Sequence, residues 1–150
     1  MSNTFSVAVT WTRHSDDTVE KFHRGHDVAY GSGTTIPASS GTDFGGDADR
    51  VNPEEQLIGA LSSCHMLTFL AIAAKKRLVV AGYTDAADGI LAKNAAGRMA
   101  VTVVTLRPKV VFGGEKQPGA DEVKALHDSA HRNCFIASSV ASDVRVEPVV

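Results

Sequence analysis

Cysteine is scarce in this chain, which contains two, Cys64 and Cys134, among 150 residues. So small a number excludes a fold that is held together by a disulfide framework. In a reducing compartment, a pair of thiols is more often catalytic, metal-binding or part of an inert core. Which of these three roles applies is the main question that the sequence poses.

The sequence also lacks a strong charge of either sign. The formal net charge is -2, which gives no electrostatic reason to expect binding to nucleic acid or to an anionic membrane. The first residues show no basic region followed by an apolar run. We therefore expect a soluble cytoplasmic protein with small-molecule or protein partners, no nucleic acid and no membrane. A hydrophobic content of 43% is sufficient for one domain over residues 1–150.

One long helix is the element around which the rest of the chain is organised. Residues 51–77 contain a suitable N-cap in Asn52, a proline at the first helical position, and a basic end at residues 75–77. Apolar residues spread over nearly all faces of its second half, which predicts a buried helix. At ~1.5 Å per residue it would span ~37 Å, enough for a central axis wrapped by other elements.

Alternating and turn-forming patterns predict the remaining elements. We expect strands at residues 5–11, 18–22, 28–30, 99–106 (continuing past Pro108) and 139–147, a helix at 121–132, and a loop at 31–50. The first two strands should form a hairpin, and the long loop should form a wall or lid of a pocket. This order is typical of an α+β fold with an antiparallel sheet wrapped around the central helix.

The apolar character of the central helix also predicts a partner. One sheet and one short helix of the same chain cannot cover a helix that is apolar on nearly every face. A second copy of the protein is the natural cover, so we expect a homodimer.

The sequence contexts of the two cysteines differ. Cys64 lies in the middle of the central helix near Leu61 and Leu67, where an inert buried thiol would be ordinary. Cys134 follows the second helix, and the neighbouring Arg132 favours a thiolate there. From these contexts alone, inert and reactive roles both remain open.

A metal site is one alternative. His127, His131 and Cys134 stand at positions i, i+4 and i+7 on one helix face, and their ligand types suit zinc. However, there is no companion Cys-x-x-Cys motif, and two histidines at this spacing are more often solvated or capping residues.

Two segments carry a resemblance to a known family. The stretch Asn52-Pro-Glu-Glu-Gln-Leu-Ile-Gly-Ala-Leu-Ser-Ser-Cys64, together with Ala130-His-Arg-Asn-Cys134-Phe-Ile-Ala-Ser-Ser-Val140, resembles the OsmC/Ohr family of osmotically inducible and organic hydroperoxide resistance proteins. The resemblance implies an intertwined α+β homodimer that reduces organic hydroperoxides at the expense of a thiol or dithiol reductant. It also implies that Cys64 is the peroxidatic cysteine, Cys134 the resolving cysteine and Glu54 the active-site glutamate. We expect no cofactor and no metal.

The resemblance leaves two candidates for the active-site arginine. Ohr-like members carry it in a segment that His23-Arg24-Gly25-His26-Asp27 resembles, whereas OsmC-like members carry it nearer the helix, where Arg50 stands. We favour Arg24. The chain has Cys134-Phe-Ile-Ala where Cys-Pro is common in the family, so it resembles a separate OsmC-like branch.

The chemistry accounts for these residue types. A thiolate is needed to attack an O–O bond, and an apolar pocket raises the pKa of a thiol, so a cation such as Arg24 would stabilise the anion. Glu54 could hold the guanidinium in a bidentate pair. Attack would give a Cys64 sulfenic acid and an alcohol, and Cys134 would trap the sulfenic acid as a disulfide. A non-catalytic protein that binds an apolar ligand is the other alternative.

Helix geometry constrains how the site could be assembled. Glu54 and Cys64 are ten residues apart, which on one straight helix means ~15 Å of rise and ~280° of rotation. Both cannot contact the same peroxide group from one helix. We therefore expect two antiparallel helices, with Glu54 of one chain approaching Cys64 of the other.

Overall fold

The computed structural model describes residues 2–150, whose contacts divide into two compact units, Met1–Gln56 and Leu57–Val150. The boundary falls in the first turn of the long helix α1 (Pro53–Lys75), so this helix begins in the first unit and continues in the second. The expectation of a single domain over residues 1–150 stays a prediction.

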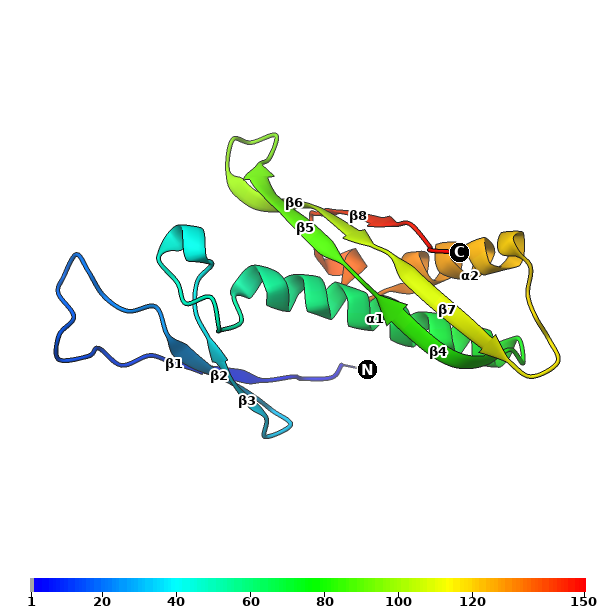
Figure 1. Cartoon of the computed structure of the whole chain (residues 1–150), viewed down its shortest axis with the longest axis horizontal. Coiled ribbons are helices and arrows are strands. Elements are labelled where there is room, and N and C mark those ends of the chain that lie inside the picture. Colours follow the sequence, from blue (N-terminus) through cyan, green and yellow to red (C-terminus); the bar gives the residue numbers. More distant parts are fainter. Residues whose placement is uncertain (1) are drawn as a thin grey trace. The chain divides into compact units, whose positions relative to one another are not determined.

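The first unit contains a three-stranded antiparallel sheet. Its strands are β1 (Val7–Thr10), β2 (His26–Tyr30) and β3 (Thr35–Ala38), in the order β1-β2-β3 (Figure 1). A tight turn joins β2 to β3, and Gly33 adopts a φ of 92° there, which favours glycine. Strand β3 and the short 3-10 helix η1 (Thr42–Phe44) lie within residues 31–50, so our expectation of one long loop was wrong. In the sequence, Pro37 argues against a strand at this position. The structure accommodates the proline because β3 lies at the edge of the sheet, where a missing N–H is tolerated.

The expected strand at residues 18–22 is absent from the described structure, and β1 pairs with β2 instead. The side chains of this segment bind its own backbone. Asp17 accepts hydrogen bonds from the backbone N–H groups of His14 and His23, and the Thr18 hydroxyl accepts one from Lys21. Such local bonds compete with strand pairing. Burial would raise the pKa of Asp17, but the hydrogen bonds from His14 and His23 lower it to about 2.

Helix α1 confirms the predicted central helix. Asn52 and Glu55 form a capping box, in which the Glu55 N–H donates to Asn52 Oδ1 over 2.8 Å and the Asn52 N–H donates to Glu55 Oε2 over 3.2 Å. The helix ends at Lys75, and Arg77 then adopts a left-handed φ of 56°. Its bounds are therefore within two residues of those expected.

One face of α1 is buried within the chain. Leu61, His65, Phe69 and Ala73 recur every four residues and form this buried stripe, whereas Leu67 is 59% exposed. By length and composition alone, α1 is apolar enough to cross a membrane, but a stripe packed into a protein core is typical of a central helix. Outside the stripe, Leu57, Ile58 and Ile72 are only half-buried and Leu67 is exposed, so the burial of this apolar surface against a second copy stays a prediction.

The second unit contains two further sheets. Strands β4 (Val79–Asp85) and β7 (Pro108–Gly113) form an antiparallel pair, and β5 (Asp88–Lys93), β6 (Met99–Leu106) and β8 (Asp143–Val146) form a sheet in the order β5-β6-β8. The strand at residues 99–106 is confirmed. The last strand is shorter than predicted because a 3-10 turn, η2 (Ala137–Ser139), precedes it. Strand β8 pairs with β6 in parallel, so not every strand pair is antiparallel as expected.

Two hydrophobic clusters join these elements. In one, Phe69 of α1 packs with Leu126 and Ala130 of the second helix, α2 (Ala120–Asn133), against side chains of β4 and β7. In the other, Leu61 packs with Val104 and Leu106 of β6. Figure 1 shows β4 and β7 running along α1. The fold is thus the expected α+β class, with strands of both sheets packed on the central helix.

A pair of buried histidines lies where α1 meets α2. His65 Nε2 and His127 Nδ1 are 3.0 Å apart, and both residues are 1% exposed. Their outer nitrogens, His65 Nδ1 and His127 Nε2, have no hydrogen-bond partner among residues 2–150. Burial lowers the pKa of each histidine to about 4, and in His65 the neighbouring histidines add to the effect. The pair is therefore neutral at pH 7.

We expect this pair to make the fold sensitive to acid. The folded pKa values of about 4 lie below the ordinary value of 6.5, so the unfolded chain binds more protons between these pH values. The free energy of unfolding should fall as the pH drops from about 6.5 to about 4, by up to about 3 kcal/mol for each imidazole. Urea unfolding at pH 7 and at pH 4.5 measures the loss. A His65→Leu, His127→Leu double variant should lose much of this dependence, and an unchanged dependence would contradict the assignment.

Candidate functional site

The structure brings the two cysteines together in the second unit. Cys64 is half-buried in the middle of α1, and Cys134, the C-cap residue of α2, is 1% exposed. Both are free thiols, and their side chains are close enough that each one shifts the pKa of the other. Residues that are far apart in the sequence therefore form one dithiol site.

The end of α2 positions the second thiol. The helix ends at Asn133, the backbone of Cys134 is extended, and the chain then turns into η2. The Ala137 N–H donates to Cys134 Sγ over 3.4 Å. This junction between α2 and η2, residues 134–137, therefore presents backbone N–H groups to the sulfur atoms.

The same junction shifts the pKa values of the two thiols in opposite directions. Burial by itself would raise the pKa of Cys64, but hydrogen bonds from the Ile136 backbone, the Cys134 thiol and the Phe135 backbone outweigh it and lower that pKa. Burial raises the pKa of Cys134, and the adjacent Cys64 raises it further. Cys64 is thus the better thiolate, with Cys134 as its thiol donor.

Cys64 opens into an apolar groove of about 880 Å³. The groove is lined by residues of α1 and of the junction after α2, including Leu67, Ile72, Phe135 and Ile136. Phe135 is 81% exposed, so part of this apolar lining faces outward. The groove is wide enough for the alkyl or aryl part of a small molecule to lie beside the thiol.

Arg24, Arg50 and Glu54 all lie in the first unit. The Arg24 guanidinium lies 3.9 Å from the centre of the Phe22 ring and donates to the Phe22 carbonyl, while Arg50 pairs with Asp47 over 3.7 Å. Glu54 is half-buried in the first turn of α1, and within residues 2–150 no ion pair joins it to either arginine. Their proposed roles stay predictions.

Arg24 also lines a hollow of about 510 Å³ within the first unit. Trp11 and Phe22 contribute apolar surface to it, and Pro53 brings the start of α1 to its edge. The structure therefore gathers one candidate arginine, aromatic side chains and the beginning of the central helix around a single concave surface.

The zinc alternative at His127, His131 and Cys134 is not assembled. His127 faces His65, and the Cys134 thiol faces Cys64. Across residues 2–150, the three side chains with His, Cys, Asp or Glu ligand atoms within 4.8 Å of one another are elsewhere in the chain, in the first unit.

Sequence reasoning missed the groups that act on the Cys64 thiol. The backbone N–H groups of Phe135 and Ile136 leave no signal in a sequence, because any residue except proline provides one. Thr68 lies one helical turn from Cys64, but its hydroxyl donates to the Cys64 carbonyl over 2.8 Å, so its one O–H hydrogen is already used.

Comparisons with known proteins identify the family. The family model described as OsmC-like protein matches residues 46–149. An OsmC-like protein of unknown function from Vibrio cholerae is 41% identical, with a TM-score of 0.93 over 99% of this chain and 100% of that chain. A comparison with curated proteins gives no match.

More distant solved structures share the fold. An organic hydroperoxide resistance protein from Legionella pneumophila is 16% identical, with a TM-score of 0.75 over 99% of this chain and 98% of that chain. The organic hydroperoxide resistance protein OhrB of Bacillus subtilis is also 16% identical, with a TM-score of 0.71 and 98% coverage of each chain.

We expect Cys64 to ionise below an ordinary cysteine, because backbone and thiol donors at the junction stabilise its anion. The rate of its alkylation by iodoacetamide should therefore level off at a lower pH than that of a free thiol. Peptide-resolved mass spectrometry can follow Cys64 and Cys134 separately, and Cys134 should react only at higher pH. Equal titration of both cysteines would contradict this polarity.

Proposed function

The chain belongs to the OsmC-like protein family, and from this membership we propose that it is a thiol-dependent peroxidase that reduces organic hydroperoxides to alcohols. The observation that carries the proposal is the Cys64 thiol, which has a lowered pKa, contacts Cys134 and opens into an apolar groove. Two relatives of the same fold are named organic hydroperoxide resistance proteins.

In the first step, the Cys64 thiolate attacks one oxygen of the peroxide bond. Its electron pair forms the S–O bond while the O–O bond breaks, which gives a sulfenic acid and an alkoxide. The alkoxide takes up a proton and leaves as the alcohol. The groove would hold the organic part of the substrate beside the sulfur, so it favours alkyl or aryl hydroperoxides over hydrogen peroxide.

In the second step, the Cys134 sulfur attacks the sulfenic sulfur of Cys64. A disulfide forms and the hydroxyl leaves as water, so a second peroxide cannot drive Cys64 to the irreversible sulfinic acid. An external thiol or dithiol then reduces the disulfide by exchange. The contact between the two side chains supports this step, because disulfide formation requires adjacent sulfurs.

We further propose that two chains share each site. OsmC and Ohr proteins are often homodimers, and the single chain leaves apolar surface in need of cover. On β1 and just before it, Phe5, Val7 and Val9 are 90%, 56% and 66% exposed, and Leu67 of α1 is 59% exposed. In an antiparallel pair of α1 helices, the hollow that contains Arg24 and the nearby Glu54 would cover the partner's cysteine groove.

A cytoplasmic location fits this chemistry. A reducing compartment would keep Cys64 and Cys134 as thiols and would supply the reductant for each cycle. The same groove also suits a non-catalytic protein that binds an apolar ligand. Only peroxide turnover separates these two functions.

The direct test is to treat the purified protein with cumene hydroperoxide in the absence of reductant. Wild-type protein should reduce about one peroxide per chain, lose both free thiols and lose two hydrogens in intact mass. Cys64→Ser should slow the reaction at least ~100-fold because it removes the nucleophile. Cys134→Ser should allow a first turnover and then accumulate sulfinic acid at Cys64. Wild-type rates in both variants would refute the peroxidase and favour the ligand-binding alternative.

Shared sites are tested by mixing a Cys64→Ser chain with a Glu54→Gln chain. The mixed dimer would contain one intact site, so its activity should rise above that of either parent protein. Isolated heterodimers without recovery, or a protein that is monomeric in solution, would contradict the arrangement.

The same mixing experiment separates the two arginines. Arg24→Ala is expected to complement Cys64→Ser in the way Glu54→Gln does, and Arg50→Ala serves as the matched control. If Arg50→Ala is inactive by itself and Arg24→Ala is active, Arg50 is the active-site arginine.

A further inference from the structure

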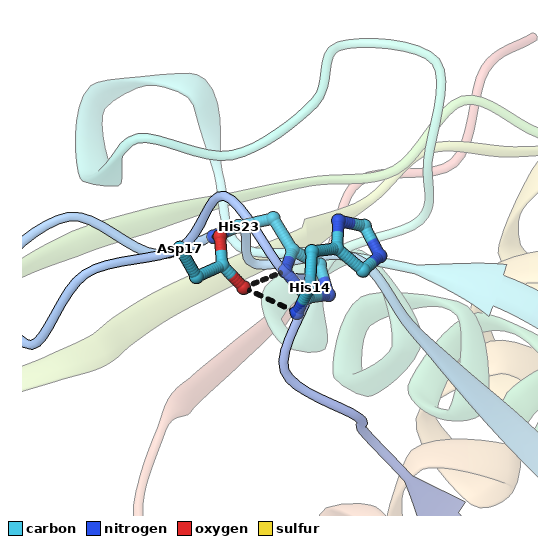
Figure 2. Close-up of side chains that lie close together, drawn as sticks. All are labelled: His14, Asp17 and His23. Atoms are coloured by element: carbon cyan, nitrogen blue, oxygen red, sulfur yellow. Dashed lines mark hydrogen bonds and ion pairs between the residues drawn. The ribbon is translucent and has the colours of Figure 1, made fainter.

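Three potential metal ligands meet in the loop between β1 and β2, outside the proposed peroxidase chemistry. One ligand atom from each of His14, Asp17 and His23 lies within 4.8 Å of the other two. Figure 2 shows the Asp17 carboxylate close to His14 and His23. His14 and Asp17 belong to one turn, and His23 lies on the returning part of the loop. All three residues belong to the first unit, whereas both cysteines belong to the second.

The carboxylate of Asp17 is held in a fixed position. Its side chain is 8% exposed, and its two oxygens accept the N–H groups of His14 and His23 over 2.8 Å and 2.9 Å. His23 Nδ1 lies 2.5 Å from Asp17 Oδ2. These hydrogen bonds hold a carboxylate oxygen of Asp17 next to an imidazole nitrogen of His23.

Aromatic stacking fixes the imidazole of His23. Its ring lies between Trp11, whose ring centre is 5.2 Å away, and His14, whose ring is 3.4 Å away and within 5° of parallel. The Trp11 indole N–H also donates to the His23 carbonyl. The two imidazoles are therefore stacked face to face without help from a bound ion.

Closing the loop does not account for the His14 side chain. The backbone N–H groups of His14 and His23, together with the His23 ring, already satisfy Asp17. Within residues 2–150, the ring of His14 makes no hydrogen bond, and the residue is exposed although its ring stacks on His23. A second imidazole is thus available next to a preformed pair of imidazole and carboxylate.

We propose that His14, Asp17 and His23 form a binding site for one divalent transition-metal ion of the zinc type. Two imidazole nitrogens and one carboxylate oxygen are a ligand set that suits Zn²⁺, and a solvent molecule would complete a tetrahedral shell. Ligands at ~2.1 Å from a tetrahedral ion are ~3.4 Å apart, so the donor atoms must move closer together. The His14 ring must also turn out of its stack with His23, so that its nitrogen lone pair points at the ion. The exposed His14 side chain is free to make that movement.

Binding would replace the hydrogen bond between His23 and Asp17 with two bonds to the metal. The ion would then join both ends of the segment 14–23, which directly precedes Arg24. The loop would be cross-linked whether or not the cysteines react, so this inference does not depend on the proposed peroxidase.

The test is a calorimetric titration of the full-length protein with Zn²⁺. Thiolates also bind zinc, so each variant is made in a chain with both cysteines replaced by serine, with the wild-type chain titrated alongside. We expect one ion per chain, with binding at least ~10-fold weaker in His14→Ala and in His23→Ala. His26→Ala, which removes a nearby histidine outside the cluster, should bind zinc like the parent chain.

Cobalt provides an independent spectroscopic measurement at the same site. Co²⁺ should give visible absorption typical of a tetrahedral site in the parent chain, and this band should be lost in His14→Ala and in Asp17→Asn. Asp16→Asn is the matched control for the lost charge. Equal zinc affinity in His14→Ala and the parent chain, or an equal loss in His26→Ala, would overturn the site. Circular dichroism confirms that each variant is folded.

Discussion

The structure depends on the burial of a single stripe of α1. Leu61, Phe69 and Ala73 are fully buried, and with His65 they fix which face of the helix packs into the protein. Cys64 immediately precedes His65, so it lies ~100° around the helix from the buried stripe. That rotation places the thiol at the edge of the core, close to the junction after α2 yet open to the groove.

Long segments with strong composition and end signals were predictable, and segments governed by local hydrogen bonds were not. Residues 53–75 form a long apolar run with a capped start and a basic end, residues 99–106 are rich in β-branched residues, and both formed the expected elements. The extended run expected at residues 18–22 is short, and the side chains of Asp17 and Thr18 instead bind the backbone N–H groups of His23 and Lys21. The parallel pairing of β8 with β6 could not be predicted, because the sequence of a strand does not show which other strand it pairs with.

The candidate site shows the same division. Burial statistics for a mid-helix cysteine favoured an inert thiol, and only the family resemblance indicated Cys64 and Cys134 as a pair. Their contact depends on where α2 ends relative to α1, which no spacing in the sequence encodes. The opposite pKa shifts of the two thiols follow from backbone geometry at residues 134–137, so a list of conserved side-chain types would have missed their cause.

Apart from the Cys134 thiol, the donors that stabilise the Cys64 thiolate are the main-chain N–H groups of Phe135 and Ile136. Main-chain donors remain when the side chains change. Side chains at residues 135 and 136 can vary in size without removing those donors. Proline is the exception, because it has no N–H to give. Where Cys-Pro is common among OsmC and Ohr proteins, this chain has Phe135, whose N–H helps to lower the pKa of Cys64. The residue type at one position thus adjusts the acidity of the thiol through the main chain, and related proteins can differ in reactivity while keeping the same two cysteines.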